Sequence, residues 1–207
     1  MKNGDFVKLN YTGRLEDGTV FDTTDPATAK TANMQADVQP VTICIGEKML
    51  IPGLDEALTS EKDKQFTTIV PAEKAFGKKD TKLLRVIPTQ QLSKQKIQPY
   101  PGMQLNIDNN YGIVKTTGGG RTVVDFNHPL AGKDVSYEVE VLDEKISTNA
   151  KVAALLKASS VPYKTITVKE KHATVQFEQM LPEPMLNIIQ ETIKRLTDIT
   201  TVSFENI

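Results

Sequence analysis

The sequence predicts an α+β protein: an antiparallel half-barrel sheet wrapped on a short helix, an inserted small β-rich domain and a C-terminal αββαβ domain. Strands with alternating apolar residues lie at both ends of the first 146 residues, and a Pro-Gly pair opens a short helix between them. A basic stretch interrupts this set of strands. We expect domains at residues 1–81 plus 128–146, 82–127 and 147–207.

The first part of the chain is typical of an antiparallel sheet. Apolar residues alternate with polar ones from Val7 to Tyr11, and Asp17-Gly18 marks a hairpin turn. Residues 23–40 carry Thr, Ala, Pro, Asn and Asp without periodicity, so we expect a long exposed excursion there. The β-branched runs at 41–45 and 66–70 predict two further strands.

A short helix is expected between those two strands. Large aliphatic residues run from Met49 to Ile51 directly before Pro52, and Leu54 and Leu58 follow at helical spacing. Proline suits the first turn of a helix because its φ is already fixed. We therefore expect this helix to plug a half-open sheet and to leave a cavity at its mouth.

The segment 82–127 differs from its surroundings in charge. It holds 6 basic and 2 acidic residues, whereas 1–81 holds 10 and 13 and 128–207 holds 9 and 11. Alternation in 135–141 predicts a strand that completes the first sheet, so the basic segment is expected to be an inserted, all-β domain. Its strands are expected at 103–107, 111–115 and 121–126.

The last sixty residues predict an αββαβ unit. Possible N-caps begin at Ser147, and a helical stripe runs through Val152, Leu155 and Leu156. The later elements are expected as strands at 163–168 and 173–177, a helix from Glu183 and a strand at 199–204. Because this size is near the lower limit for independent folding, we expect the unit to pack on its neighbour or on its own copy.

Several functions are disfavoured by composition. The net charge of -1 gives no bias toward nucleic acid or membrane, and Cys44, as the one cysteine, excludes an internal disulfide and a cysteine-based zinc site. The glycines at 118–120 lack the Lys-Ser/Thr of a phosphate-binding loop. Without a secretory signal in the first residues or a long apolar run, we expect a cytoplasmic location.

Five motifs together resemble those of the FKBP-type peptidyl-prolyl isomerases. The likeness covers roughly residues 1–145, and residues 127–133 resemble the SlyD branch, in which an insert-in-flap chaperone domain interrupts the isomerase domain. The motifs are Val7 to Gly13, Asp17 to Asp22, Leu50 to Leu54, Ala75-Phe76-Gly77 and Asn127 to Lys133. The C-terminal piece resembles that of the long archaeal members.

The resemblance implies an apolar pocket that accelerates rotation about X-Pro bonds. It implies the catalytic residues Tyr11, Asp22, Ile51, Phe76 and Tyr137, and the substrate-binding residues Phe21, Val41, Leu50, Leu54 and Leu130. Three positions depart from the family pattern, because Leu54 stands where many members have tryptophan, Phe76 where tyrosine is common, and Tyr137 where phenylalanine is common. The chain lacks the His- and Cys-rich tail of SlyD, so no metal or other cofactor is expected.

The insert holds more apolar residues than so small a sheet can bury. Exposed apolar side chains usually mark a binding surface, so we expect some of them to bind client chains. The candidates are Met103, Leu105, Tyr111, Ile113 and Val123. The resemblance implies unfolded or partly folded polypeptides with X-Pro bonds as partners and possible binding of macrolide inhibitors. A homodimer through the C-terminal domain is a further possibility, and neither nucleic acid nor membrane is expected as a partner.

Two alternatives remain open from the residues. Alternating aromatic and aliphatic residues on strands are usually core, and six basic residues over 46 positions are usually a solvated face. A holdase chaperone with weak or absent isomerase activity is the rival function, and Phe76 favours it because it lacks the tyrosine hydroxyl.

Overall fold

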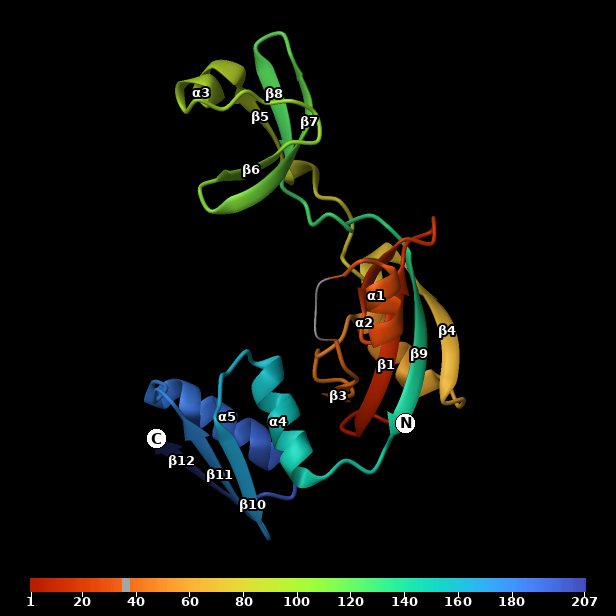
Figure 1. Ribbon diagram of the computed structural model, residues 1–207, viewed down its shortest axis with the longest axis vertical. Helices are drawn as coiled ribbons and strands as arrows, with labels where there is room; N and C mark the ends of the chain where they lie inside the picture. The colour runs from red at the N-terminus through yellow and green to blue at the C-terminus, as the bar shows by residue number, and fades with distance from the viewer. Residues whose placement is uncertain (35–37) are drawn as a thin grey trace. The chain divides into compact units, whose positions relative to one another are not determined.

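The computed structural model describes residues 1–34 and 38–207. The chain forms two compact units, one of residues 1–70 and 134–207 and the other of residues 71–133 (Figure 1). Antiparallel sheets dominate, and the helices are few, which confirms the predicted α+β class.

The first unit contains the predicted antiparallel sheet. Its order is β2 (Val20–Thr23), β1 (Phe6–Arg14), β9 (Val135–Asp143) and β4 (Gln65–Val70), and β3 (Val41–Cys44) also pairs with β1. Strand β1 is the organising strand, because its first half pairs with β3 and its second half pairs with β2. Strand β9 lies between β1 and β4, as expected for a strand that completes the sheet.

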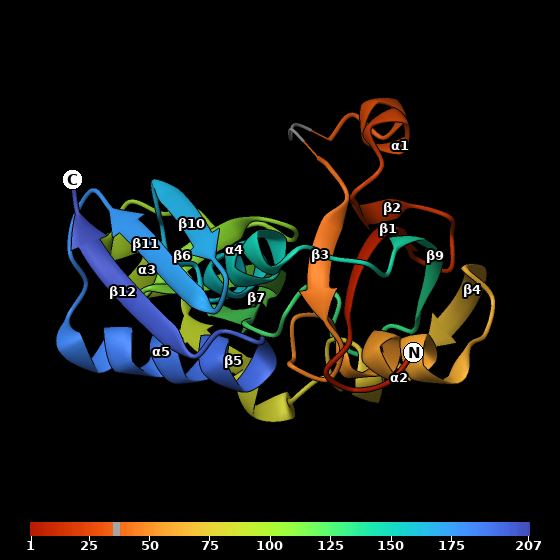
Figure 2. The ribbon, with the colours of Figure 1, turned by 90° about the horizontal axis from the view of Figure 1, so that it is seen from below.

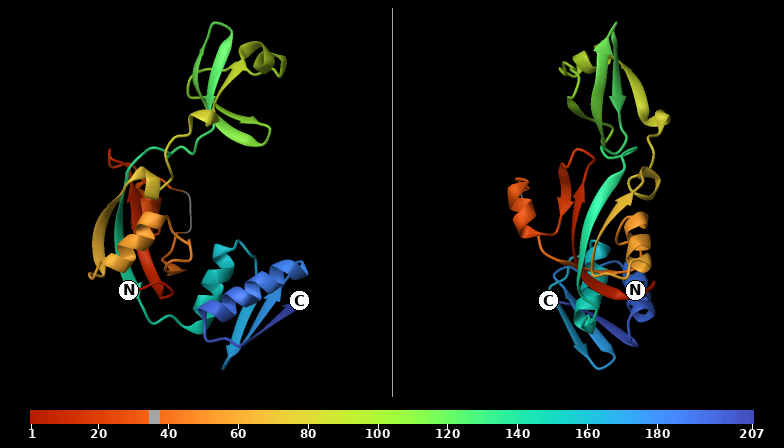
Figure 3. Two further views of the ribbon diagram at one scale, coloured as in Figure 1. Left: turned by 180° about the vertical axis from the view of Figure 1, so that it is seen from behind. Right: turned by 90° about the vertical axis from the view of Figure 1, so that its right-hand side faces the viewer.

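Helix α2 (Pro52–Ser60) covers the sheet, with Pro52 in its first turn (Figure 3). Leu54 and Leu58, four residues apart, are both buried. The facing side of the sheet is apolar because alternate residues of β9 point inward, and these are Val135, Tyr137, Val139 and Val141. The helix therefore plugs the sheet by burying one apolar stripe.

The expectation of a long exposed excursion over residues 23–40 is wrong for the first half of that range. Thr23 ends β2, and α1 (Pro26–Thr31) follows at once. The carboxylate of Asp25 caps this helix by accepting the backbone N–H of Thr28 at 2.8 Å. A six-residue helix is too short to show periodicity, so capping forms it rather than an apolar stripe. Residues 35–37 lie outside the described residues.

The C-terminal elements follow the predicted αββαβ order (Figure 2). They are α4 (Thr148–Ala158), β10 (Thr165–Lys169), β11 (His172–Phe177), α5 (Glu183–Leu196) and β12 (Thr201–Asn206). Strand β10 is antiparallel to β11, and β12 is parallel to β11 because α5 provides the crossover. Alternate residues of β11 are buried with the inward faces of α4 and α5, so both helices cover one face of this sheet.

The C-terminal elements pack against the first sheet. Phe6 of β1 and Cys44 of β3 belong to the same buried cluster as the C-terminal core. The Lys151 ammonium of α4 lies 5.4 Å from the centre of the Phe6 ring. Arg195 of α5 donates two hydrogen bonds of 2.7 Å to the Glu47 carboxylate. The neighbour expected for this small unit is thus the first sheet.

The second unit is built on a four-stranded antiparallel sheet of order β5-β8-β7-β6. Its elements are β5 (Leu84–Pro88), α3 (Thr89–Lys94), β6 (Gln104–Ile107), β7 (Asn110–Gly118) and β8 (Arg121–Asp125), preceded by the short 3₁₀ turns Ala72–Lys74 and Thr81–Leu83. The expectation of an all-β segment is wrong, because α3 contributes Leu92 to the core with Leu105, Val114 and Val124.

The two chain segments that enter and leave this sheet are joined by Asn127. Its side-chain N–H donates to the backbone carbonyl of Asp80 at 3.0 Å, and its amide oxygen accepts the Asp80 N–H at 2.8 Å. The Asp125 carboxylate accepts both the Asn127 backbone and side-chain N–H groups. These bonds, with Asp125 buried, fix the base of the unit.

Candidate active site

A tyrosine and a carboxylate meet where β1 pairs with β2. The pairing places Gly13 opposite Asp22, and Tyr11 lies two residues back along β1. The Tyr11 hydroxyl donates a hydrogen bond of 2.9 Å to Asp22 Oδ2. This bond holds the carboxylate in one orientation.

Three aromatic rings from three strands form a cluster beside this bond. Tyr137 of β9 lies edge-on to Tyr11, with ring centres 5.8 Å apart. It also lies edge-on to Phe21 of β2, again at 5.8 Å and with an angle of 88° between the rings. Edge-to-face contacts at this distance are the favoured aromatic geometry. The sheet register therefore brings Tyr137 beside two residues that lie more than a hundred positions earlier in the chain.

Gly13 makes this cluster possible, and its role was not predicted. A Cβ atom at Gly13 would lie 2.6 Å from Phe21 Cζ and 3.0 Å from Tyr137 Cε1, closer than carbon atoms can approach. The glycine thus leaves the space that both rings occupy. A glycine inside a strand pattern is a sequence signal for such a close approach.

Burial and the Asp22 charge keep the pocket tyrosines neutral. Burial raises the pKa of Tyr11 above its ordinary value, and the neighbouring Asp22 carboxylate and its hydrogen bond raise it further. Burial also raises the pKa of Tyr137, with the charge of Asp22 as the second cause. Both hydroxyls therefore remain protonated well beyond neutral pH.

The remaining predicted residues of the first unit lie near the N-terminal end of α2. Leu54 is buried in the first turn, and Leu50 and Val41 line a cavity together with Tyr11. The Ile51 carbonyl accepts the N–H of Leu54 at 3.0 Å. Among the hydrogen bonds of the described residues none uses the Ile51 N–H, which leaves this donor available to a ligand.

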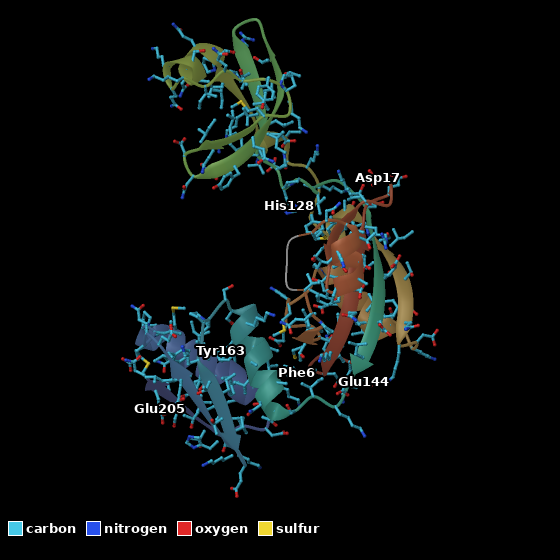
Figure 4. All side chains as sticks on the ribbon, in the orientation of Figure 1. Phe6, Asp17, His128, Glu144, Tyr163 and Glu205 are labelled. Carbon is cyan, nitrogen blue, oxygen red and sulfur yellow. The ribbon has the colours of Figure 1, made fainter. Side chains whose placement is uncertain are left out.

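Two predicted residues, Phe76 and Leu130, belong to the second unit. The Phe76 ring stacks on His128 with ring centres 4.8 Å apart and 2° between the planes. Leu130 is half-buried, and its N–H donates to His128 Nδ1 at 3.2 Å. Figure 4 labels His128, which lies in the segment that returns from the sheet of the second unit. Phe76 and Leu130 thus both contact His128.

The predicted client-binding residues differ in exposure. Tyr111 is 78% exposed, Met103, Ile113 and Val123 are half-buried, and Leu105 lies in the core with an exposed fraction of 5%. Leu105 therefore packs the domain and presents no surface. Sequence reasoning missed Val86, which is 60% exposed on β5. The β-branched pair Val86-Ile87 before Pro88 was the available signal.

Two other kinds of site are absent from residues 1–34 and 38–207. No three side chains of His, Cys, Asp and Glu gather there as metal ligands. No helix in the same ranges has the length and apolar character needed to cross a membrane. The first unit instead offers an apolar aromatic cluster with one oriented carboxylate, which suits an uncharged, planar ligand group.

Comparisons with known proteins agree with this geometry. Residues 85–130 match a family described as the FKBP26 IF domain. A short-type peptidyl-prolyl cis-trans isomerase of Methanocaldococcus jannaschii is 32% identical over 148 residues, which cover 69% of this chain and 93% of the relative.

Two bacterial relatives extend the comparison. A probable FKBP-type 16 kDa peptidyl-prolyl cis-trans isomerase of Pseudomonas fluorescens is 33% identical over 144 residues, covering 67% of this chain and 88% of the relative. The FKBP-type peptidyl-prolyl cis-trans isomerase SlyD of Treponema pallidum is 29% identical over 155 residues, covering 72% and 81%.

Proposed function

Because the chain belongs to the FKBP-type peptidyl-prolyl cis-trans isomerases, we propose that it accelerates X-Pro isomerisation in unfolded or partly folded polypeptides. The observation that carries the proposal is the cluster of Tyr11, Phe21 and Tyr137 around a carboxylate oriented by Tyr11. A proline ring fits such an aromatic pocket, and the oriented carboxylate gives the pocket one fixed polar side.

The chemistry needs no nucleophile and no metal. Rotation about a peptide bond faces a barrier of about 18–20 kcal/mol, because amide resonance must be lost. Uncatalysed X-Pro exchange accordingly takes on the order of 10–100 s at 25 °C. The twisted transition state has lost its charge-separated resonance form, so an apolar, water-poor pocket favours it over the planar ground state.

Five of the predicted residues have a further proposed role in this step. Leu54 forms the floor of the proline pocket, and the Ile51 N–H takes a substrate carbonyl. Asp22 acts electrostatically on the rotating amide without accepting a proton. Phe76 and Leu130 are proposed to add apolar contacts to the substrate. Because Phe76 carries no hydroxyl, it contributes only apolar surface.

The second unit is proposed to capture client chains. Its exposed apolar side chains Val86 and Tyr111 support this role, and so does its match to the FKBP26 IF domain family. Strands β5 and β6 are the edges of its sheet, and an extended client can pair with such an edge. Local capture raises the concentration of client prolines at the pocket.

A peptide assay tests the isomerase proposal. We expect the full chain to accelerate exchange of short prolyl peptides, followed by protease-coupled absorbance or by exchange NMR. Asp22→Ala is expected to lower kcat/KM, and Lys171→Met, which alters an exposed residue of the C-terminal domain, is the matched control. Rates equal to those in buffer would contradict the proposal and leave a holdase that binds chains without isomerising them.

Deletion of the insert tests the division of labour. Replacing residues 83–126 by a short loop is expected to leave catalysis on short peptides largely intact. It is expected to reduce strongly the catalysis of a proline-limited refolding reaction of a whole protein. An equal fall in both rates would contradict a separate client-binding role.

Three finer features belong to the same proposal. A homodimer is supported by the exposed apolar residues of the C-terminal domain, among them Ile188 at 68% and Met185 at 44% exposed. Light scattering of the full chain tests it, and a monomer mass counts against it. Macrolide binding would show as inhibition of the peptide assay. Action in the cytoplasm stays a prediction from the sequence.

A further inference from the structure

A cavity of about 360 Å³ lies between the first sheet and helix α4. Val41 and Leu50 line it on the sheet side, next to Tyr11. Ala153 and Lys157 line it on the side of α4. Tyr163, which follows α4, closes the same side and is labelled in Figure 4. Two domains of one chain thus form its walls.

The packing of α4 explains why this space stays open. The helix turns Val152, Leu155 and Leu156 into the C-terminal core. Its small side chains, including Ala153, face the first sheet and cannot fill the gap. The paired hydrogen bonds from Arg195 to Glu47 hold the C-terminal domain in place. The opening is therefore a feature of the fold.

The chemistry of the walls is apolar with one positive charge. Among the lining residues that the structure describes, none carries a carboxylate and Lys157 is the one cation. Tyr163, 39% exposed, adds a hydroxyl at the rim. Such a lining suits an aliphatic side chain and favours an acidic neighbour over a basic one.

We infer that this cavity is a client subsite, which takes an apolar side chain near the isomerised proline and sets sequence preference through Lys157. The inference rests on the proposed isomerase function, because Tyr11, Val41 and Leu50 belong both to the cavity and to the predicted prolyl pocket. An extended chain advances about 3.3–3.6 Å per residue, so residues flanking the proline continue from one space into the other.

Ala153→Phe tests the apolar part of the subsite. Eight-residue peptides with one proline would carry Leu or Ala at each of three positions on either side, and kcat/KM would be measured by exchange NMR. We expect Leu to be preferred about tenfold at one position or more, since added methylene groups discriminate on this scale. Ala153→Phe fills the space and is expected to abolish that preference.

Asn187→Phe is the matched control, because Asn187 is exposed on α5 and does not line the cavity. It is expected to retain the preference for Leu. Equal kcat/KM values for all peptides with the wild-type chain would overturn the inference while leaving the isomerase function intact. The same holds if Ala153→Phe keeps the preference. Failure of every peptide to isomerise would overturn the function and, with it, the subsite.

Lys157→Met gives a second readout that does not depend on filling the cavity. Lys157 is exposed, so its loss leaves the core of α4 unchanged. At low salt, we expect the wild-type chain to prefer Glu over Lys about threefold at a position next to the favoured Leu. Lys157→Met is expected to remove this preference, and Lys171→Met to keep it. A preference that is unchanged in Lys157→Met would overturn the role of Lys157.

Discussion

Gly13→Ala is the most informative single change, because it adds one methyl group to the centre of the aromatic cluster. The new Cβ would lie 2.6 Å from Phe21 Cζ and 3.0 Å from Tyr137 Cε1. Carbon atoms pack at about 3.5–4.0 Å, so the Phe21 ring must retreat by roughly 1 Å. Because Asp22 directly follows Phe21 on β2, we expect this movement to disturb the hydrogen bond from Tyr11 to Asp22.

The expected magnitudes follow from this displacement. Overpacking costs about 1–3 kcal/mol, and the loss of glycine freedom in the unfolded chain offsets about 0.4–1 kcal/mol. A net loss of about 1–2 kcal/mol lowers the melting temperature by about 2–8 °C for a chain of this size. A misplacement of about 1 Å near the reacting group can cost on the order of 100-fold, so kcat/KM should fall about 10- to 100-fold.

Gly112→Ala is the matched control for this experiment. Its Cβ would lie 2.6 Å from Val124 Cγ1, the same clash distance, but inside the second unit. We expect Gly112→Ala to lower the melting temperature and to leave short-peptide catalysis near the wild-type rate. Gly118→Ala has open space around its Cβ and is expected to change neither quantity.

A wild-type kcat/KM for Gly13→Ala in a folded protein would contradict this role of the aromatic cluster. The cluster would then be ordinary core packing, and the prolyl site would have to lie elsewhere. A loss of activity shared equally by Gly13→Ala and Gly112→Ala would refute it too, since general destabilisation would explain both.

Three further predictions concern other contacts. Tyr11→Phe removes the hydrogen bond to Asp22 and should lower kcat/KM about 10-fold, because a hydrogen bond to a charged group contributes roughly 1.5–3 kcal/mol. An unchanged kcat/KM would exclude a role of Tyr11 in orienting Asp22. Burial by itself would raise the pKa of Asp125, but hydrogen bonds from Asn127 and the charges of Lys79 and Lys115 together hold it below its ordinary value. The ionised Asp125 carboxylate therefore stabilises the folded state fully above about pH 5, and this stabilisation fades below about pH 4. Thermal unfolding should therefore depend more on acid in the wild type than in Asp125→Asn, and equal acid sensitivity would contradict this. Arg195→Gln and Glu47→Gln should each lower the melting temperature slightly and by the same amount, and the double variant should show no further loss.

Local sequence signals predicted most of the fold. The αββαβ order and the sheet strands other than β5 could be read because their apolar periods extend over several residues. Helix α1 could not, since its six residues depend on one cap at Asp25. Helix α3 was missed for the same reason, because its buried contribution to the core is the single residue Leu92. Short helices are set by caps and tertiary contacts that periodicity does not report.

The candidate site was predictable only in part. The resemblance implied that Tyr11, Phe21, Asp22 and Tyr137 share one pocket, and in the structure their side chains lie together. The space required by Gly13 was not foreseen, because it depends on the register of three strands. Nor could the sequence show that α4 lines the cavity next to Tyr11, since that contact depends on how the C-terminal domain packs on the first sheet.

The central place of β9 in the first sheet has a consequence for synthesis. Strand β9 begins at Val135, after the whole insert, yet it separates β1 from β4. A nascent chain therefore finishes the insert while the isomerase sheet still lacks its middle strand. Domains fold as units from the N-terminal side during translation, so the second unit is complete first. The unit proposed to hold a client is therefore formed before the sheet that carries the aromatic cluster.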